Sequence, residues 1–461
     1  MELVSQRAIT LVKPRRDSFK SPKPDAPRVL VYDIFSEVNR RGGYSNLLLP
    51  QALNASNFEQ RDKGFATELL YGTLRMQGRH DYILAQVSDR PWSEVDEGIV
   101  DICRLGVHQL FEMRVATHAA VSATVELARK VIGESKASFV NAILRKVSAK
   151  SLEEWMEPVL LMSDPVSRLS IQYSHPEWIV SAYFDLLKDF DRVEAELSAN
   201  NVPAMPTLVS WPGSSTREEL VAEGGVATRY SPYGAKFDGP PGSLDLIRHR
   251  KAGVQDEGSQ LVALAFSNAT QSAKSVLDLC AGPGGKAALI SHICDVEGRD
   301  FVANEVSEAR AKLVKNVVGK FPVWVGDGRE IASHDQHFDA IIADVPCTGL
   351  GALRRRPEVR WRRTLQDLRA LTELQLELSN AAITALNAGG IFAYATCSPH
   401  FAETFGQVKM IVKAHPELEQ IDVSPYLPTS LQGAVRDKCM ALWTSVHDTD
   451  SMFLALFKKS T

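Results

Sequence analysis

Residues 275–286 read Ser-Val-Leu-Asp-Leu-Cys-Ala-Gly-Pro-Gly-Gly-Lys, and this stretch decides the fold of the C-terminal half of the chain. Its apolar run, residues 276–280, is typical of a strand that is covered on both faces of a parallel sheet. Three glycines then interrupt the run, and the segment that begins at Lys286 has the pattern of a helix. A strand, a glycine turn and a helix form a cradle in which bare backbone N–H groups face a ligand. The sequence therefore predicts a site for a nucleotide-like cofactor.

The charge at this turn distinguishes between two kinds of cofactor. Gly282, Gly284 and Ala287 satisfy a loose dinucleotide pattern, and Glu305 follows at about the usual spacing of 20 residues. Asp278, however, lies four residues before the first glycine and would repel a pyrophosphate. A ligand that carries an ammonium and a sulfonium would be attracted, and S-adenosylmethionine is such a ligand.

Strands and helices alternate from Gly253 onward. Apolar runs that end near Glu305, Asp327, Asp344 and Thr396 predict four more strands, and helical patterns separate them. This alternation predicts an α/β, Rossmann-like, doubly wound parallel sheet, in which ligands bind beyond the carboxyl ends of the strands.

Acidic residues at these strand ends can be assigned to an adenosine. Glu305 is placed to accept hydrogen bonds from both ribose hydroxyls, and Asp327 from the adenine amino group. A helix N-cap or a solvated loop carboxylate is the alternative for each acid. The predicted cofactor residues are Asp278, Cys280, Ala281, Gly282, Pro283, Gly284, Gly285, Lys286, Glu305, Asp327 and Asp344.

Two cysteines follow neighbouring predicted strands. Cys347 ends the segment Asp344-Val-Pro-Cys, and Cys397 lies in Thr396-Cys-Ser-Pro. Because consecutive strands of such a sheet are usually neighbours, both thiols should open into one cleft. The other four cysteines lie in apolar runs or lack polar neighbours and are expected to be buried and inert: Cys103, Cys280, Cys294 and Cys439. None has the close paired spacing of a zinc site, so no metal is predicted.

The loop 350–363 contains six arginines, one acid and one tryptophan. A solvated charged face is the default interpretation of such a run. An aromatic residue among arginines also suits phosphate contacts and base stacking, which makes the loop a candidate RNA surface. The candidate residues are Arg354, Arg355, Arg356, Arg360, Trp361, Arg362 and Arg363.

The sequence before residue 251 divides into three parts. Residues 1–24 carry six Lys or Arg against two acids, and we expect a disordered basic tail, with loose RNA contact as the alternative. Residues 25–150 have helical periodicity, as at Val31, Ile34, Phe35 and Val38, and predict a helical domain for binding. Residues 151–250 mix helical stretches with Pro/Gly turns, which indicates a small α+β connecting subdomain; residues 251–461 form the cofactor-binding domain.

Composition excludes some broad classes of protein. The 461 residues are 44% hydrophobic and 23% charged, with a net charge of −4, so any nucleic-acid surface must be a local patch. No apolar run has the roughly 18 residues of a membrane helix, and the first 27 residues lack the apolar core of a secretion signal. We therefore expect no membrane partner and a cytoplasmic location, where thiols stay reduced.

Four of these motifs resemble those of the RNA cytosine-5 methyltransferase family. They are residues 276–286, Asp344-Val-Pro-Cys347, residues 355–361 and Tyr394-Ala-Thr-Cys-Ser398. Segments 139–145, 174–178, 254–256 and 450–453 extend the resemblance to the bacterial ribosomal (RsmB or Sun) subgroup, which has an N-terminal helical RNA-binding domain similar to the antitermination factor NusB. The departures are small: Gly282, Glu305 and Ser451 stand where Ala, Asp and Gly are common.

The resemblance implies an activity and roles for three residues. S-adenosylmethionine would methylate C5 of a cytosine in RNA, and the subgroup points to 16S ribosomal RNA before subunit assembly is complete. Cys397 would be the nucleophile that adds to C6, Cys347 would assist product release, and Asp344 would hold the N3/N4 edge of the cytosine. The target base must be unstacked or single-stranded to enter the site.

Other functions remain open at this point. The same chemistry on tRNA or another RNA is one alternative. The second is an NAD-dependent oxidoreductase, disfavoured by Asp278 and the thiol pair, and the third is a non-catalytic RNA-binding assembly factor. Neither the protein partners nor the oligomeric state can be predicted from the residues.

Overall fold

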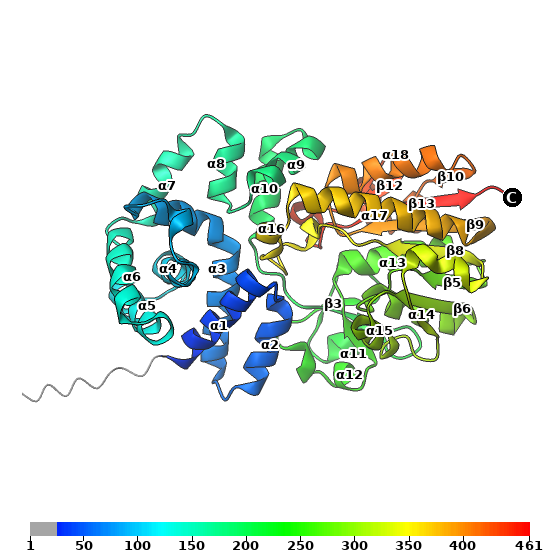
Figure 1. Ribbon diagram of the computed structural model, residues 1–461. Coiled ribbons are helices and arrows are strands. Elements are labelled where there is room, and N and C mark those ends of the chain that lie inside the picture. The colour runs from blue at the N-terminus through cyan, green and yellow to red at the C-terminus, as the bar shows by residue number, and fades with distance from the viewer. Residues whose placement is uncertain (1–24) are drawn as a thin grey trace, which may run out of the picture.

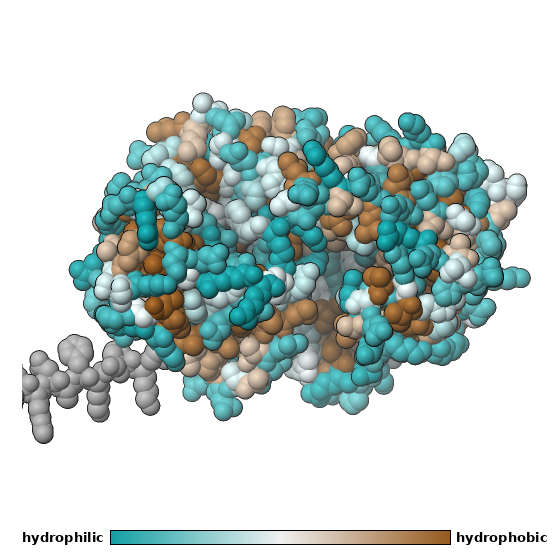
Figure 2. All heavy atoms as spheres, in the orientation of Figure 1, coloured by the Kyte–Doolittle hydropathy of each residue, from teal (hydrophilic) through white to brown (hydrophobic). Residues whose placement is uncertain are grey.

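The computed structural model describes residues 25–461, and the expected basic tail lies outside this range. Along the chain follow a helical N-terminal domain, a connecting region and a C-terminal α/β domain (Figure 1). Hydrophilic side chains cover much of the face in Figure 2, and a hollow separates the N-terminal helices from the C-terminal half.

The N-terminal domain is a bundle of six helices. The predicted apolar stripe of the first helix, Val31, Ile34, Phe35 and Val38, is buried in the core. The fourth helix is buried along most of its length because it packs against the first, third, fifth and sixth. The helices are α1 (Ala26–Arg41), α2 (Ser45–Ala55), α3 (Gln60–Val87), α4 (Glu97–Phe111), α5 (Thr117–Ile132) and α6 (Glu134–Val147).

The connecting region has a helical part and a sheet part. Four helices come first: α7 (Leu152–Leu160), α8 (Pro165–Gln172), α9 (Glu177–Leu187) and α10 (Phe190–Asn200). An antiparallel sheet in the order β2-β3-β1-β4 follows, and it carries two short helices. Its elements are β1 (Thr207–Ser210), α11 (Arg217–Ala222), β2 (Val226–Ala227), β3 (Gly234–Lys236), α12 (Asp245–Arg248) and β4 (Ala252–Val254).

The C-terminal domain contains the predicted doubly wound sheet. Five strands run parallel in the order β7-β6-β5-β8-β9. They are β5 (Ser275–Asp278), β6 (Asp300–Glu305), β7 (Val323–Val325), β8 (Phe338–Asp344) and β9 (Leu386–Thr396). The connecting helices are α13 (Glu257–Ala269), α14 (Gly285–Glu297), α15 (Glu308–Lys315), α16 (Val359–Arg362), α17 (Leu365–Thr384) and α18 (Phe405–Ala414).

Alternate residues of the central strands enter two different cores. On β8, Ala340 and Ile342 pack in one core with α13 and α14, whereas Ile341 and Ala343 pack in the other with α17 and α18. Helices therefore cover both faces, which explains why these strands read as continuous apolar runs. The predicted fold class is confirmed.

The sheet also has an antiparallel edge that the sequence did not predict. Strand β13 (Phe453–Lys459) lies antiparallel beside β9, and β10 (Leu418–Ile421) and β12 (Cys439–Ala441) pair with β13; β11 (Val435–Arg436) pairs with β12. These strands follow one another through loops and the short helix α19 (Thr444–His447) rather than through long crossover helices. Antiparallel pairing does not need such crossovers.

Candidate active site

The carboxyl ends of β5, β6, β8 and β9 meet at one edge of the sheet and carry most of the predicted residues. The glycine turn lies between β5 and α14, where Gly284 has a φ of 117° that disfavours any residue with a side chain. A Cβ atom on Gly282 would lie 2.1 Å from Oε2 of Glu305. The turn therefore needs glycine because a carboxylate from the next strand approaches its backbone.

Glu305 is held by that turn. Its side chain is buried, and it accepts hydrogen bonds from the backbone N–H of Gly282 at 2.9 Å and of Ser307 at 3.0 Å. The carboxylate is thus fixed beside the glycines, where sequence reasoning expected a ribose.

Asp278 is a buried carboxyl with an unused oxygen. Its Oδ1 accepts a hydrogen bond from the N–H of Cys280 at 3.3 Å, whereas the buried Oδ2 has no partner among the described residues. Burial, with the neighbouring Asp344, raises the pKa of Asp278 to about 7. A buried acid with a free oxygen calls for a cationic or donating ligand. This environment fits the ammonium and sulfonium of S-adenosylmethionine.

Lys286 joins the glycine turn to the next strand. It lies in the first turn of α14, is buried, and its Nζ lies 2.8 Å from Oδ2 of Asp344 at the end of β8. Burial lowers the pKa of Lys286, but Asp344 more than offsets this effect and the pKa is raised. The lysine thus stays charged and fixes the Asp344 side chain.

The two predicted thiols are in contact. Sγ of Cys347 and Sγ of Cys397 lie 3.3 Å apart, because β8 and β9 are parallel neighbours. The hydrogen bond from Cys347 lowers the pKa of Cys397, assisted by the positive charges of Arg356 and Lys286. The same contact, together with burial, raises the pKa of Cys347. Cys397 is therefore the thiol that ionises first.

A buried network that the sequence did not reveal holds the two thiol loops. Glu403 is fully buried and accepts hydrogen bonds from the N–H and hydroxyl of Thr348. The Thr348 hydroxyl lies 3.1 Å from that of Ser398, so the residues that follow the two cysteines are linked directly. Glu403 lies in a short 3-10 helix and follows no periodic pattern, so nothing in the sequence marked it.

Asp327 takes the alternative role of a helix cap. It precedes a short 3-10 helix, accepts a hydrogen bond from the N–H of Arg329 and forms an ion pair with that side chain. The Arg329 contact lowers the pKa of Asp327. Its carboxylate lies at the sheet edge that holds Glu305, but is engaged within its own loop.

The arginine run does not form the exposed face expected from the sequence. Arg354 is buried and Arg355 is half-buried, and both form ion pairs with Asp256 and Asp450. Arg354 also contacts Asp448. As a candidate RNA contact each of these two arginines is corrected, because its charge is already matched inside the protein.

The end of the run enters the N-terminal domain. Arg360 is fully buried and donates hydrogen bonds to the carbonyl oxygens of Arg75 and Ser174 and to Asn201. Trp361 donates to the carbonyl of Leu74. Arg360 is likewise corrected as an RNA contact because it is not accessible, and Trp361 is only partly accessible.

Arg362 also contacts the N-terminal domain, whereas its neighbour Arg363 does not. Arg362 donates to the carbonyl oxygens of Val38 and Gly43. Arg363 is partly exposed, and its side chain forms no hydrogen bond or ion pair with the described residues. Of the seven candidates, Arg356 and Arg363 keep guanidinium groups without protein partners in the part of the chain that the structure describes.

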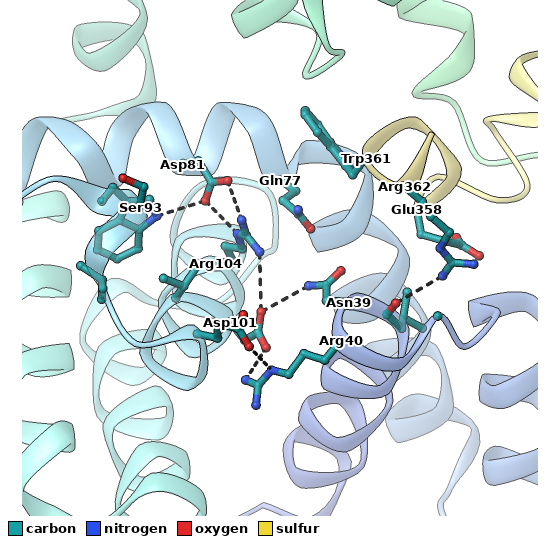
Figure 3. Close-up of a pocket in the computed structure, with 16 residues that line it drawn as sticks. Asn39, Arg40, Gln77, Asp81, Ser93, Asp101, Arg104, Glu358, Trp361 and Arg362 are labelled. Atoms are coloured by element: carbon teal, nitrogen blue, oxygen red, sulfur yellow. Dashed lines mark hydrogen bonds and ion pairs between the residues drawn. The ribbon is translucent and has the colours of Figure 1, made fainter. Parts of the chain in front are cut away.

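The same junction borders a cavity of about 670 Å³, and neither thiol lines it (Figure 3). Ion pairs between Arg40 and Asp101 and between Arg104 and Asp81 line its wall. Its charges are largely matched, and we assign it no catalytic role.

The described residues contain no cluster of three or more side chains that could hold a metal ion. Within residues 25–461, no helix is both long and apolar enough to cross a membrane.

Two family models match the two ends of the chain, and relatives match most of its length. A family model described as 16S rRNA methyltransferase RsmB/F matches residues 265–458, and a NusB family model matches residues 25–149. A putative methyltransferase of Mycobacterium tuberculosis, MT1451, is 39% identical over 446 residues, which cover 95% of this chain and 97% of the relative. Ribosomal RNA small subunit methyltransferase B of Pseudomonas putida is 31% identical over 401 residues, which cover 82% of this chain and 87% of that protein.

A solved structure supports the same fold. The crystal structure of PH0851 superposes with a TM-score of 0.77 at 20% identity and covers 95% of this chain and all of its own (100%). The methyl donor is S-adenosylmethionine, and the unpartnered Oδ2 of Asp278 fits that cation. The chain thus belongs to the 16S rRNA methyltransferase RsmB/F family, with a NusB-like domain ahead of its methyltransferase domain.

Proposed function

We propose that the protein methylates C5 of a cytosine in 16S ribosomal RNA through a covalent bond between Cys397 and C6 of the base. The observation that carries the proposal is the thiol pair: two sulfur atoms 3.3 Å apart whose pKa values shift in opposite directions. C5 of cytosine is too weak a nucleophile to accept a methyl group unaided. A thiolate that adds to C6 turns C5 into an enamine carbon, and this explains the need for a poised thiolate.

S-adenosylmethionine supplies the electrophilic methyl group. The residues proposed to hold it are Asp278, the turn from Cys280 to Lys286, Glu305, Asp327 and Asp344. Asp278 would face the cationic end of the cofactor with its free Oδ2. Glu305, fixed by the N–H of Gly282, would accept from the ribose.

Asp344 and Lys286 would orient the base. Lys286 holds one carboxylate oxygen of Asp344 at 2.8 Å, which leaves the other oxygen for the amino edge of the cytosine. A base fixed by this edge presents C6 to Cys397. Asp344 lies at the end of β8 and Cys397 directly follows β9, so adjacent strands set their spacing.

Cys347 would act after methyl transfer. A base must take the proton from C5, the electron pair of that C–H bond restores the C5–C6 double bond, and the C6–S bond breaks with its pair returning to Cys397 as the thiolate. Cys347 loses its hydrogen-bond acceptor once Cys397 is bonded to carbon, so its sulfur becomes available beside the adduct. We assign it to product release on this basis.

The family name and the names of the relatives support 16S ribosomal RNA as the substrate, and a cytoplasmic site of action accords with that substrate. The NusB-like domain would add RNA contacts.

The experiment that tests the proposal uses the Cys347→Ala variant. Incubated with the small-subunit rRNA transcript and S-adenosylmethionine, it should accumulate a protein–RNA complex that survives a denaturing gel, because the adduct forms but is not released. Cys397→Ala should abolish methylation and leave cofactor binding within a few-fold. The double variant should give no complex. Complex formation by Cys397→Ala instead would assign the nucleophile to Cys347, and mapping of 5-methylcytosine in the rRNA identifies the base.

A further inference from the structure

Arg356 differs from four of the other five arginines in the run. Arg354, Arg355, Arg360 and Arg362 each donate hydrogen bonds to acceptors inside the protein. The guanidinium of Arg356 forms no hydrogen bond or ion pair with any residue from 25 to 461, although it is half-buried. A half-buried cation has lost part of its hydration, and a ligand that donates negative charge would complete its contacts.

The position of Arg356 points to the substrate. The N–H of Gly351 donates to the carbonyl of Cys397 at 2.8 Å, which joins this loop to the nucleophile. The N–H of Arg356 is held in turn by the carbonyl of Ala352 at 3.0 Å. Its Nη2 lies 3.8 Å from the place of a Cβ on Gly349, two residues after Cys347. The free guanidinium therefore lies beside the loop that follows Cys347, and the backbone of that loop is bonded to Cys397.

The charge of Arg356 and those of the two sulfur atoms shift one another's pKa values. Burial lowers the pKa of Arg356, but Cys397 and then Cys347 raise it, and the net shift is upward. In return Arg356 lowers the pKa of Cys397. The guanidinium and the attacking sulfur are thus close enough to contact the same nucleotide.

The chemistry of that nucleotide specifies what the guanidinium meets. A pyrimidine nucleotide in the anti conformation has C6 on the side of its own 5′-phosphate. When C6 approaches Cys397, this phosphate must enter beside the sulfur. Arginine matches a phosphate with two parallel hydrogen bonds, more closely than lysine does.

We propose that Arg356 forms the subsite for the 5′-phosphate of the target nucleotide. The inference rests on the proposed function, since it takes Cys397 as the group that meets C6. Before RNA binds, the guanidinium stabilises the Cys397 thiolate. When the carbon–sulfur bond forms, the sulfur loses its negative charge and the phosphate replaces it as the anion beside Arg356.

Protection of Cys397 from alkylation tests the subsite with small probes. Iodoacetamide labelling of the full-length protein is followed by peptide mass spectrometry, which separates Cys397 from Cys347. Cytidine 5′-monophosphate should protect Cys397 at about tenfold lower concentration than cytidine, the effect of one charge-assisted contact. Arg356→Gln should remove the difference between the two probes, and Arg356→Lys should keep only part of it.

The matched control is Arg369→Gln, an exposed arginine on α17 outside the site. It should keep the preference for the phosphorylated probe, and bound S-adenosylmethionine confirms that each variant is folded. Equal protection by both probes in the unaltered protein, no protection by either, or a preference that survives Arg356→Gln would overturn the subsite.

This test is separate from that of the proposed function. If Cys347→Ala forms the RNA adduct but Arg356→Gln keeps the probe preference, only the subsite fails. If the preference depends on Arg356 but no adduct forms and no cytosine is methylated, the phosphate subsite stands and the proposed chemistry fails.

Discussion

At the scale of single residues, the two thiols show how neighbouring residues give two identical chemical groups different roles. Cys347 and Cys397 both follow strands of the parallel sheet, and the sequence predicted that they share a cleft. Residue pattern alone could not rank them, because the ranking comes from the hydrogen bond between the two sulfur atoms, the burial of Cys347 and the cation of Arg356 near Cys397. The sequence thus located the two thiols, and tertiary contacts decide which of them has the lower pKa.

Asp278 makes cofactor binding depend on pH. Burial and Asp344 raise its pKa from 3.8 to about 7. S-adenosylmethionine is a cation and favours the ionised carboxylate of Asp278. Below neutral pH the carboxyl must therefore lose its proton when the cofactor binds. Affinity for S-adenosylmethionine should therefore weaken by up to about tenfold per pH unit as the pH falls from about 7 to 5.5. Isothermal titration calorimetry measures this slope.

Asp278→Asn should bind weakly and without this slope, whereas Asp327→Asn should keep it because the pKa of Asp327 is already lowered. The same shift has the opposite consequence for the cofactor-free fold. A carboxyl with a raised native pKa destabilises that fold as the pH rises from about 4 to 7. Asp278→Asn should thus raise the melting temperature at pH 8 but not at pH 4. An unchanged binding slope in Asp278→Asn would refute the assignment.

At the scale of elements, strands and helices were easier to predict than the partners of a charged loop. Apolar runs that end in polar residues predicted strands β5, β6, β8 and β9. The arginine loop was interpreted as a surface because a sequence displays charges but not what they face. Asp256 and Asp450, which neutralise Arg354 and Arg355, lie about 100 residues away on either side.

This ion cluster should be essential for stability. Arg355→Met leaves Asp256 and Asp450 buried with one arginine between them, and should lower the free energy of unfolding by about 3 kcal/mol. Urea unfolding measures the loss. Adding Asp450→Asn to Arg355→Met should restore part of it, because one buried negative charge is removed.

Arg369→Met is the comparison for a solvated arginine and should change the stability by less than about 0.5 kcal/mol. If Arg355→Met were equally mild, the cluster would contribute nothing to the fold and the arginine run would regain its interpretation as a surface.

At the scale of the whole molecule, the loop after Cys347 ties the methyltransferase domain to the NusB-like domain. Glu358 accepts hydrogen bonds from the N–H and hydroxyl of Ser45 at the start of α2. Trp361 lies against Gly78 of α3, where an added Cβ would lie 2.3 Å from the ring. The predicted helical pattern of residues 25–150 gave no hint of this contact, since it joins segments nearly 300 residues apart.

Gly78→Ala tests whether this junction matters for catalysis. The new methyl group must displace Trp361, at a cost of about 1–3 kcal/mol. RNA methylation should fall several-fold as the thiol loop shifts, whereas S-adenosylmethionine binding should hold. Methyltransfer assays and calorimetry read the two effects.

Gly64→Ala is the matched control in the same helix, because an added Cβ there meets no atom within 4 Å. It should leave both activities unchanged. A Gly78→Ala enzyme as active as the control would show that the junction is passive.

Helix α16 also bears on how this protein can be inherited and rebuilt. Its residues are encoded with the methyltransferase domain, but Arg360 and Trp361 complete the packing of helices encoded hundreds of residues earlier. Recombination between two divergent genes can exchange their sequences at any point from residue 150 to 350. The resulting protein would have Arg360 and Trp361 from one parent and the N-terminal helices that they pack against from the other. We expect α16 and the middle of α3 to be exchanged together or not at all, so in protein engineering and in recombination they form one unit.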